Sequence, residues 1–428
     1  MAAPFMYRAW VVASMGLVPF FARSQTAKLR EQGVPIIRAH EKLGHATHDR
    51  QGSGPLIWFH AASVGESLSV LALITRMGLI LPNAQFLITS GTATSAKLIA
   101  QRMPPRTVHQ FAPLDAPGPL KRFLRHWHPD AAIFVESELW PQMLRRTFGT
   151  GTRMALVNAR LSDKSIEQWR KWPKIARYIF EVFDLILTQN DAMAQKMVLI
   201  HAPADRVARG INLKSMAGPL PIDEDALFEA RAALGYRPVW VASSTHDGEE
   251  NAVLQAHRTL LKQFPDLCLI LAPRHPERGD AVEALIREAG LSCHRRSRGE
   301  EPGAQVYLAD SLGELGLWYA LGDIVFLGGS LLPIGGHNPF EVAQSGAAVL
   351  SGSHVSAFAE TYAQLETEGA ARIIADGRDL AQSVADLLSS PDQLKEMTDA
   401  AKRFVAAQDD QLDQIAARLV SVLKLDAP

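Results

Sequence analysis

One segment of the sequence combines a carboxylate with the features of a strand-to-helix turn. The run His60-Ala61-Ala62-Ser63-Val64-Gly65-Glu66 follows a short apolar stretch and precedes one of helical period. The dipole of a helix favours an acidic residue in its first turn and favours the ionised form of that residue. An ionised carboxylate can also accept a proton from an attacking hydroxyl group. Two interpretations of Glu66 therefore stay open, a residue that only starts a helix and a general base.

Other polar groups of the first half follow apolar runs in the same way. Glu136-Ser137-Glu138-Leu139-Trp140-Pro141 brings two carboxylates and an indole, and Asn158-Ala159-Arg160 follows the next run. Asn212-Leu213-Lys214 closes this half. The ammonium group of Lys214 is suited to offset the charge of a bound anion, although an isolated lysine is also an ordinary surface residue.

The second half carries groups that suit a phosphate. The hydroxyl-rich segment 243–250 links a strand to a helix, where free N–H groups attract anions. Arg274 follows Pro273 at the end of the next apolar run, and a guanidinium group there suits phosphate or carboxylate. Glu314, Leu315 and Gly316 open a further helix. Asn338, Pro339 and Glu341 form a predicted helix start after Gly335 and Gly336, whose lack of side chains lets a ligand approach the backbone.

These segments are positioned by short apolar runs that alternate with stretches of helical period. Continuous apolar strands separated by helices predict parallel sheets covered on both faces. The pattern pauses at 215–221 and then restarts, which predicts two doubly wound α/β halves with ligands beyond the carboxyl ends of the strands, in a cleft between the halves. The strands are expected at 56–59, 85–89, 131–135, 154–157, 185–187, 239–242, 267–271, 305–308, 324–327 and 348–350.

Composition excludes several classes of protein. The chain has 428 residues, a net charge of −1 and only two cysteines, so neither a nucleic-acid-binding surface nor a disulfide framework is indicated. No GxGxxG motif follows a strand and there is no Walker A motif. Asp223-Glu224-Asp225 has the spacing of a metal motif but is typical of an acidic helix start, and the histidines lack metal-ligand spacing. No metal and no cofactor are expected.

The N-terminus differs from the rest of the chain. Residues 9–22 are uncharged and rich in apolar side chains, and basic residues outnumber acidic ones around them. The stretch is shorter than the ~20 residues that span a bilayer, and Pro19 is expected to interrupt it. Association with an anionic membrane surface is the favoured interpretation, and a buried helix and a signal peptide are the alternatives.

Taken together, the segments at 60–66, 136–141, 158–160, 212–214, 244–250, 272–278 and 335–341 resemble, in order and spacing, those of the 3-deoxy-D-manno-octulosonic acid (Kdo) transferases. The resemblance covers nearly the whole chain. It implies a GT-B fold, with CMP-Kdo as donor and a lipid A precursor as acceptor at the cytoplasmic side of the inner membrane. The expected organisation is a membrane-associating segment at 1–50, an acceptor-side domain at 51–216 and a CMP-Kdo-binding domain at 217–428.

The resemblance also assigns residues. Glu66 corresponds to the general base, and Glu136 and Lys214 to the groups that stabilise the transition state. The donor contacts correspond to Pro273, Arg274, Glu314, Leu315, Gly316, Gly336, Asn338, Pro339, Phe340 and Glu341. Gln142 departs from the asparagine common in the family. A GT-B enzyme that uses another sugar nucleotide and a non-catalytic membrane-surface scaffold are the alternatives.

Overall fold

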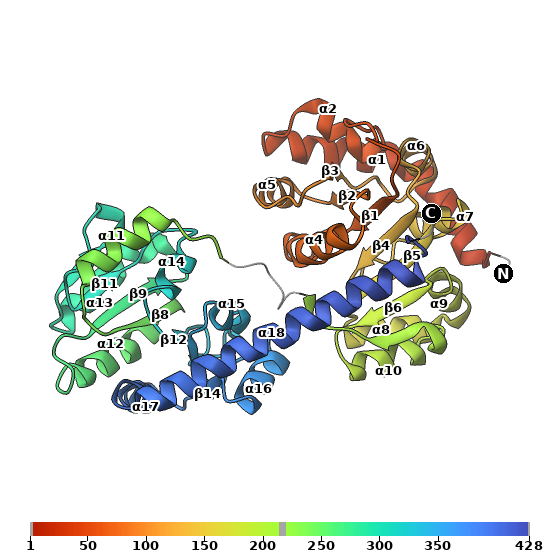
Figure 1. Cartoon of the computed structure of the whole chain (residues 1–428). Helices are drawn as coiled ribbons and strands as arrows, with labels where there is room; N and C mark the ends of the chain where they lie inside the picture. The colour runs from red at the N-terminus through yellow and green to blue at the C-terminus, as the bar shows by residue number, and fades with distance from the viewer. Residues whose placement is uncertain (1–2, 214–219, 427–428) are drawn as a thin grey trace. The chain divides into compact units, whose positions relative to one another are not determined.

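The chain folds into two compact units. The structure, a computed structural model, describes residues 3–213 and 220–426. By its contacts the chain divides into residues 1–217 with 410–428, the first unit, and 218–409, the second unit (Figure 1). The predicted division kept 217–428 together, whereas the end of the long helix α18 (Pro391–Val422) groups with the first unit. The boundary predicted between residues 216 and 217 lies outside the described residues.

The first unit is built on a seven-stranded sheet in the order β3-β2-β1-β4-β5-β6-β7, in which every neighbouring pair is parallel. Its strands are β1 (Leu56–His60), β2 (Gln85–Ser90), β3 (Thr107–Phe111), β4 (Ala131–Val135), β5 (Arg153–Ala159), β6 (Leu185–Thr188) and β7 (Val207–Arg209). Its helices after the N-terminal region are α3 (Val64–Ser69), α4 (Leu71–Ile80), α5 (Ala93–Gln101), α6 (Pro117–Trp127), α7 (Pro141–Gly149), α8 (Asp163–Lys171), α9 (Pro173–Phe180) and α10 (Asp191–Leu199).

The second unit repeats this design with the order β10-β11-β9-β8-β12-β13-β14, again all parallel. Its strands are β8 (Val239–Thr245), β9 (Cys268–Pro273), β10 (Cys293–Arg295), β11 (Val306–Leu308), β12 (Ile324–Leu327), β13 (Ala348–Ser351) and β14 (Ala371–Ile373). Its helices are α11 (Glu224–Leu234), α12 (Glu249–Leu260), α13 (Gly279–Glu288), α14 (Leu315–Tyr319), α15 (Pro339–Gln344), α16 (Ala359–Thr367) and α17 (Gly377–Ser389), followed by α18.

The predicted fold class is confirmed, because both sheets are parallel and helices alternate with strands along the chain. All ten predicted strands are present within a few residues of their expected bounds, and β3, β7, β10 and β14 were missed. Those four are the edge strands of the two sheets. An edge strand is less enclosed than a central one, so short or polar sequences such as Thr-Val-His-Gln-Phe in β3 lack the continuous apolar signal.

Aromatic side chains fill the core of each unit. In the first unit Trp58 packs against Phe123 and Phe134, with ring centroids 4.7 and 5.4 Å away, and all three are fully buried. In the second unit Trp240 and Phe326 are fully buried in a cluster with aliphatic side chains of α12 and α17. These cores fix the central strands, so the loops that follow them are held at defined positions.

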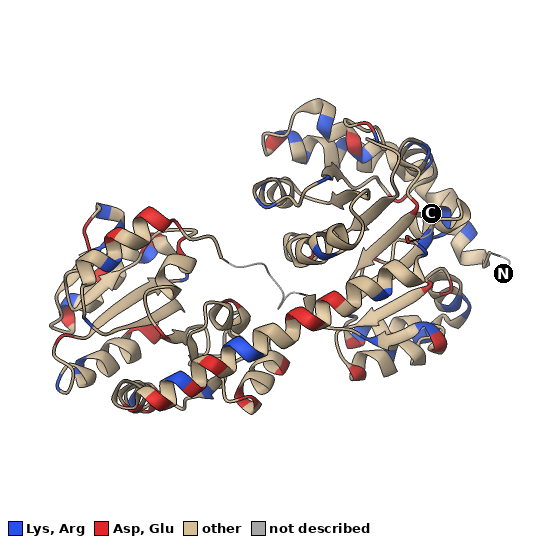
Figure 2. Cartoon of the chain, viewed as in Figure 1, with Lys and Arg blue, Asp and Glu red and all other residues tan. Residues whose placement is uncertain are grey.

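The N-terminal helix α1 (Phe5–Glu31) is far longer than its apolar stretch suggested. It has 27 residues and continues through Pro19, so the expectation that Pro19 interrupts it is wrong. It packs on the first unit through the buried side chains of Ser14, Ala22 and Leu29. Its length and composition would allow it to cross a membrane, and little of it is buried. It carries Lys and Arg but no acidic residue before Glu31 (Figure 2).

Candidate active site

Glu66 starts a helix and also keeps one carboxylate oxygen open. Ser63 caps α3 by accepting a hydrogen bond from the Glu66 backbone N–H (3.3 Å). In return, Glu66 Oε2 accepts from the N–H groups of Ala62 (2.9 Å) and Ser63 (3.3 Å). Among the described residues none hydrogen-bonds to Glu66 Oε1. The backbone therefore fixes the carboxylate through one oxygen, and the other can accept a proton.

The surroundings of Glu66 favour its protonated form. Burial is the main cause that raises the pKa of this carboxyl above its ordinary value, followed by repulsion from Glu138 and then from Glu136. The capping bonds with Ser63 oppose this change without reversing it. The dipole of α3 alone would favour the ionised form of Glu66 and so acts in the opposite direction. A carboxylate whose pKa is raised is a stronger base than a carboxylate with the ordinary pKa.

Glu138 is held in its ionised form beside this group. His60 Nε2 lies 3.2 Å from Glu138 Oε2, at ion-pair distance, and the indole N–H of Trp140 donates to the same oxygen. Burial would raise the pKa of Glu138, but the contacts with His60 and Trp140 outweigh it and lower the pKa. Two neighbouring carboxyls thus have pKa values moved in opposite directions, an arrangement that separates the roles of acid and base.

Asn158 links Glu136 to the segment that follows β7. Its side-chain amide donates to Glu136 Oε1 (3.2 Å), and its Oδ1 accepts from the Leu213 backbone N–H (3.2 Å). Glu136 and Asn158 both adopt positive φ, 55° and 54°, which is uncommon for residues other than glycine and often marks a functional site. The predicted stabiliser Lys214 follows Leu213 but lies outside the described residues.

In the second unit two buried carboxylates lie at the predicted phosphate-binding segment 243–250. Glu249, 1% exposed, accepts from the backbone N–H groups of His246, Gly329, Ser330 and Leu331 at 2.7–3.0 Å. The neighbouring Glu250 accepts from Thr245 Oγ1 (3.2 Å) and pairs with Arg278 (2.6 Å). Two carboxylates therefore occupy the start of α12, and an added phosphate would be repelled there.

Arg274 and three histidines lie near the segment that joins β8 to α12. Arg274 is exposed directly after β9, and no residue in the described part of the chain binds its guanidinium. His246 Nε2 lies 2.9 Å from His337 Nε2, so one ring must donate and the other accept. Burial is the main cause that lowers the pKa of both rings, that of His337 to about 4. The ring of His275 lies 5.8 Å from that of His246. Because the sequence places these histidines in three separate loops, spacing alone did not reveal the cluster.

Close contact with His337 explains why residue 329 is a glycine. Gly329 has a φ of 67°, and a Cβ atom there would lie 2.9 Å from the ring of His337. A side chain would displace the imidazole pair, so the close approach at this position is between protein groups.

At the predicted donor turn 314–316, protein contacts occupy the side chain of Glu314. Glu314 pairs with Arg296 (2.7 Å) and accepts from Ser311. Burial alone would raise the pKa of Glu314, but the bond from Arg296 lowers it. At Gly316 an added Cβ would meet the Pro221 carbonyl oxygen at 2.6 Å. A ligand would therefore meet this turn through the backbone.

In the segment 336–341, some residues start helix α15 and Phe340 packs in the core. Asn338 caps α15 by accepting from the Phe340 N–H (3.2 Å), and Pro339 occupies the first turn, as predicted. Glu341 accepts from the side-chain amide of Asn338 (3.4 Å). Phe340 is fully buried, with its ring 6.1 Å from that of Phe404, and Gly336 has a φ of 78°. Asn338 and Glu341 are the polar side chains of 338–341.

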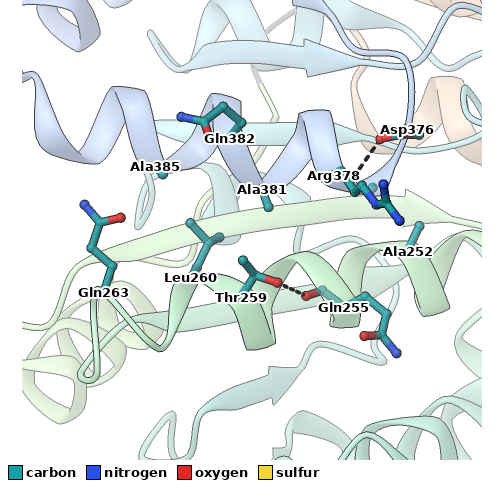
Figure 3. A pocket seen from close by; sticks show the side chains of 11 residues that line it. Ala252, Gln255, Thr259, Leu260, Gln263, Asp376, Arg378, Ala381, Gln382 and Ala385 are labelled. Atoms are coloured by element: carbon teal, nitrogen blue, oxygen red, sulfur yellow. Dashed lines mark hydrogen bonds between the residues drawn. The ribbon is translucent and has the colours of Figure 1, made fainter.

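In the described residues, neither a metal-binding group nor the groove between α12 and α17 forms a second candidate active site. Within residues 3–213 and 220–426, no group of three or more His, Cys, Asp or Glu side chains is placed to hold a metal ion. A groove of about 610 Å³ runs between α12 and α17 of the second unit, with Thr259, Gln263 and Gln382 among its lining (Figure 3). Its wall consists of helix side chains such as Ala252, Ala381 and Ala385, and it contains none of the predicted site residues.

Solved structures support the fold at low sequence identity. A structure described as a glycosyltransferase from Rickettsia africae superposes with a TM-score of 0.58 at 12% identity and covers 87% of this chain and 100% of that chain. Two parallel seven-stranded α/β units with such a neighbour define the GT-B class, in which the fold alone does not decide the substrate.

Sequence comparison gives the family. Residues 38–217 match the family model described as 3-deoxy-D-manno-octulosonic-acid transferase. The enzyme of that name from Rickettsia felis is 35% identical, over 84% of this chain and 77% of the relative. A probable mitochondrial 3-deoxy-D-manno-octulosonic acid transferase of Arabidopsis thaliana is 31% identical, over 93% of this chain and 91% of the relative. The chain belongs to the Kdo transferase family, and it is a glycosyltransferase.

Proposed function

We propose that this enzyme transfers Kdo from CMP-Kdo to a sugar hydroxyl of a lipid A precursor, with Glu66 as the general base. The observation that carries the proposal is the state of the Glu66 carboxylate. Two backbone N–H groups fix Oε2, the raised pKa strengthens the base, and Oε1 has no hydrogen-bond partner among the described residues. Oε1 accepts the hydroxyl proton as the oxygen attacks the anomeric carbon.

The neighbouring carboxylate fits the charge that develops on the sugar. Glycosyl transfer passes through a transition state with oxocarbenium character, which a nearby negative charge stabilises. Asn158, in β5, orients Glu136, which directly follows β4, for this role. Lys214, which follows the segment bound by Asn158, is proposed to offset negative charge on the departing group.

The second unit supplies the donor contacts in this proposal. The exposed guanidinium of Arg274 suits the phosphate of CMP. Asn338 and Glu341 offer an amide and a carboxylate to the nucleoside, and Pro273, Gly336, Pro339, Phe340 and 314–316 present backbone to it. The start of α12 is not part of this proposed site, because the carboxylates of Glu249 and Glu250 lie there.

Helix α1 supports action at a membrane surface. Its exposed side chains include Phe5 (84%), Val12 (69%) and Phe20 (71%), and Arg8 and Arg23 flank its apolar part. An apolar helix with basic flanks binds at the boundary of an anionic bilayer. The proposed place of action is the cytoplasmic side of the inner membrane, where a lipid-borne acceptor is accessible.

A single-atom change at the base tests this function. We expect Glu66→Gln to lower kcat on the order of 10³-fold, because an amide cannot accept the hydroxyl proton. Product formation from CMP-Kdo and a lipid A precursor is followed by mass spectrometry, and CMP binding is followed by thermal shift. CMP binding should be unchanged.

The matched control is Glu277→Gln, since Glu277 is 74% exposed in the second unit. It should retain wild-type transfer. Transfer by Glu66→Gln at the wild-type rate would exclude Glu66 as the base. Stabilisation of the wild-type protein by UDP rather than by CMP would exclude the proposed donor.

A further inference from the structure

An apolar pocket lies in the first unit beside the carboxylates. It has a volume of about 260 Å³ and is formed by α1, the segment Leu114–Ala116 and Trp140. Leu17, Val18 and Phe21 contribute its helical wall. The volume is below the ~300–1,000 Å³ of pockets that enclose a whole small ligand. It therefore suits a part of a larger molecule.

The polar side chains of Trp10, Ser14, Asp115 and Trp140 at the pocket form hydrogen bonds within the protein, and Gln25 is the remaining polar residue of its lining. Asp115 accepts from the Met143 N–H (2.6 Å), from the Gln142 N–H (3.4 Å) and from the indole of Trp10 (3.3 Å). The side-chain amide of Gln142 donates to Ser14 Oγ (2.6 Å) and so joins α7 to α1. Hydrocarbon remains the chemistry offered to a ligand, because a polar group placed here would gain few free partners.

The pocket connects two parts of the first unit that the proposed function uses. Its helical wall belongs to α1, whose exposed apolar side chains face solvent. Its opposite wall includes Trp140, whose indole N–H donates to Glu138, and the charge of Glu138 raises the pKa of Glu66. A hydrocarbon chain seated here would contact Trp140, which binds Glu138, the carboxylate that raises the pKa of the proposed base.

We infer that this pocket binds an acyl chain of the lipid acceptor and thereby positions the acceptor sugar at Glu66. The inference rests on the proposed function and adds a specific site for the chain to it. An acyl chain is favoured over a peptide side chain because the pocket continues into the apolar face of α1, which has basic but no acidic residues before Glu31.

Filling the pocket tests this inference. In Leu17→Trp a larger side chain occupies the space at a position that is already 44% exposed, so the fold should tolerate it. We expect KM for the acylated acceptor to rise about tenfold or more, since several methylene groups lose their apolar contact. KM for the same acceptor stripped of its acyl chains, kcat and sedimentation with anionic phospholipid vesicles should be unchanged.

The matched control is Val12→Trp, which adds an indole to an exposed position of the same helix outside the pocket. It should leave all these values unchanged. Equal effects of the two variants, or an equal rise in KM for the stripped acceptor, would overturn the inference in favour of general membrane adhesion or a distorted fold.

A binding measurement separates this inference from the proposed function. A fluorescent fatty acid should bind the wild-type full-length protein and bind Leu17→Trp more weakly. Such binding without any transfer by the wild type would refute the proposed function alone. Transfer that is equal in wild type and Leu17→Trp, with equal fatty-acid binding, would refute the acyl-chain site alone.

Discussion

Glu66 shows how one carboxylate can serve both a helix and a reaction. Its Oε2 completes the capping box with Ser63, which explains why an acidic residue stands at this position even without chemistry. Because the same backbone bonds fix the whole carboxylate, they also fix the position of Oε1. Burial and two further carboxylates then raise the pKa, against the helix dipole. The local contacts thus fix the geometry, and the non-local contacts set the basicity.

The charge of Glu138 can be removed with little change in shape. Because its repulsion raises the pKa of Glu66, we expect Glu138→Gln to lower the pKa of Glu66. A general base acts only when it is ionised, so the decline of kcat/KM at acid pH should move to lower pH. The pH profile of transfer measures this.

Glu167→Gln on the exposed face of α8 is the matched control and should leave the profile in place. An acid decline that stays in place or moves to higher pH in Glu138→Gln would show that Glu138 does not act on the base electrostatically.

Among the elements, the loop after β12 is held by a single carboxylate of α12. Glu249 contacts four backbone N–H groups from two loops, and each would otherwise be a buried or half-buried donor without a partner. The loop in turn places Gly329 under the pair His246 and His337. The first residue of α12 therefore stabilises the loop after β12.

Replacing this carboxylate by an amide should weaken the second unit. In Glu249→Gln one oxygen becomes an NH₂ group that faces backbone donors, so we expect a loss of about 3 kcal/mol in the free energy of unfolding. Urea denaturation followed by circular dichroism measures it.

Glu288→Gln, on the exposed side of α13, should change the free energy of unfolding by less than about 0.5 kcal/mol. A Glu249→Gln protein as stable as the wild type would show that the four N–H groups find other partners.

At the scale of the whole molecule, the chain returns to its first unit at the end. Helix α18 begins in the second unit, and residues from 410 group with the first. Its last part buries Leu412, Leu419 and Val420, and the helix carries both acidic and basic residues along its length (Figure 2). The first unit therefore includes residues that lie at opposite ends of the sequence.

A cavity in this last part should loosen the first unit. Leu419 is fully buried, so Leu419→Ala should cost about 2–5 kcal/mol. Hydrogen exchange followed by mass spectrometry should show faster exchange in β1, β4 and β5 and unchanged exchange in β8 and β9.

The neighbouring Arg418→Ala is the control, because Arg418 is exposed and its loss should leave exchange unchanged. Faster exchange in both units of Leu419→Ala would contradict the assignment of this part of α18 to the first unit.

The sequence by itself determined the two parallel α/β units, the central strands and the strand-end segments that hold Glu66, Glu136 and Arg274. These follow from apolar periodicity and from the resemblance of segments in order, both of which are local properties of the chain. It also predicted the cap of α15, because Asn338 and Pro339 are adjacent to the helix they start.

Only the tertiary structure decided which groups remain available to a ligand. Four features all depend on residues far apart in sequence: the bonds of Glu249 to the loop after β12, the His246–His337 pair, the raised pKa of Glu66 and the pocket beside Trp140. The edge strands and the return of α18 were missed for the same reason. Electrostatic and packing energies depend on distance in space, and sequence patterns report only distance along the chain.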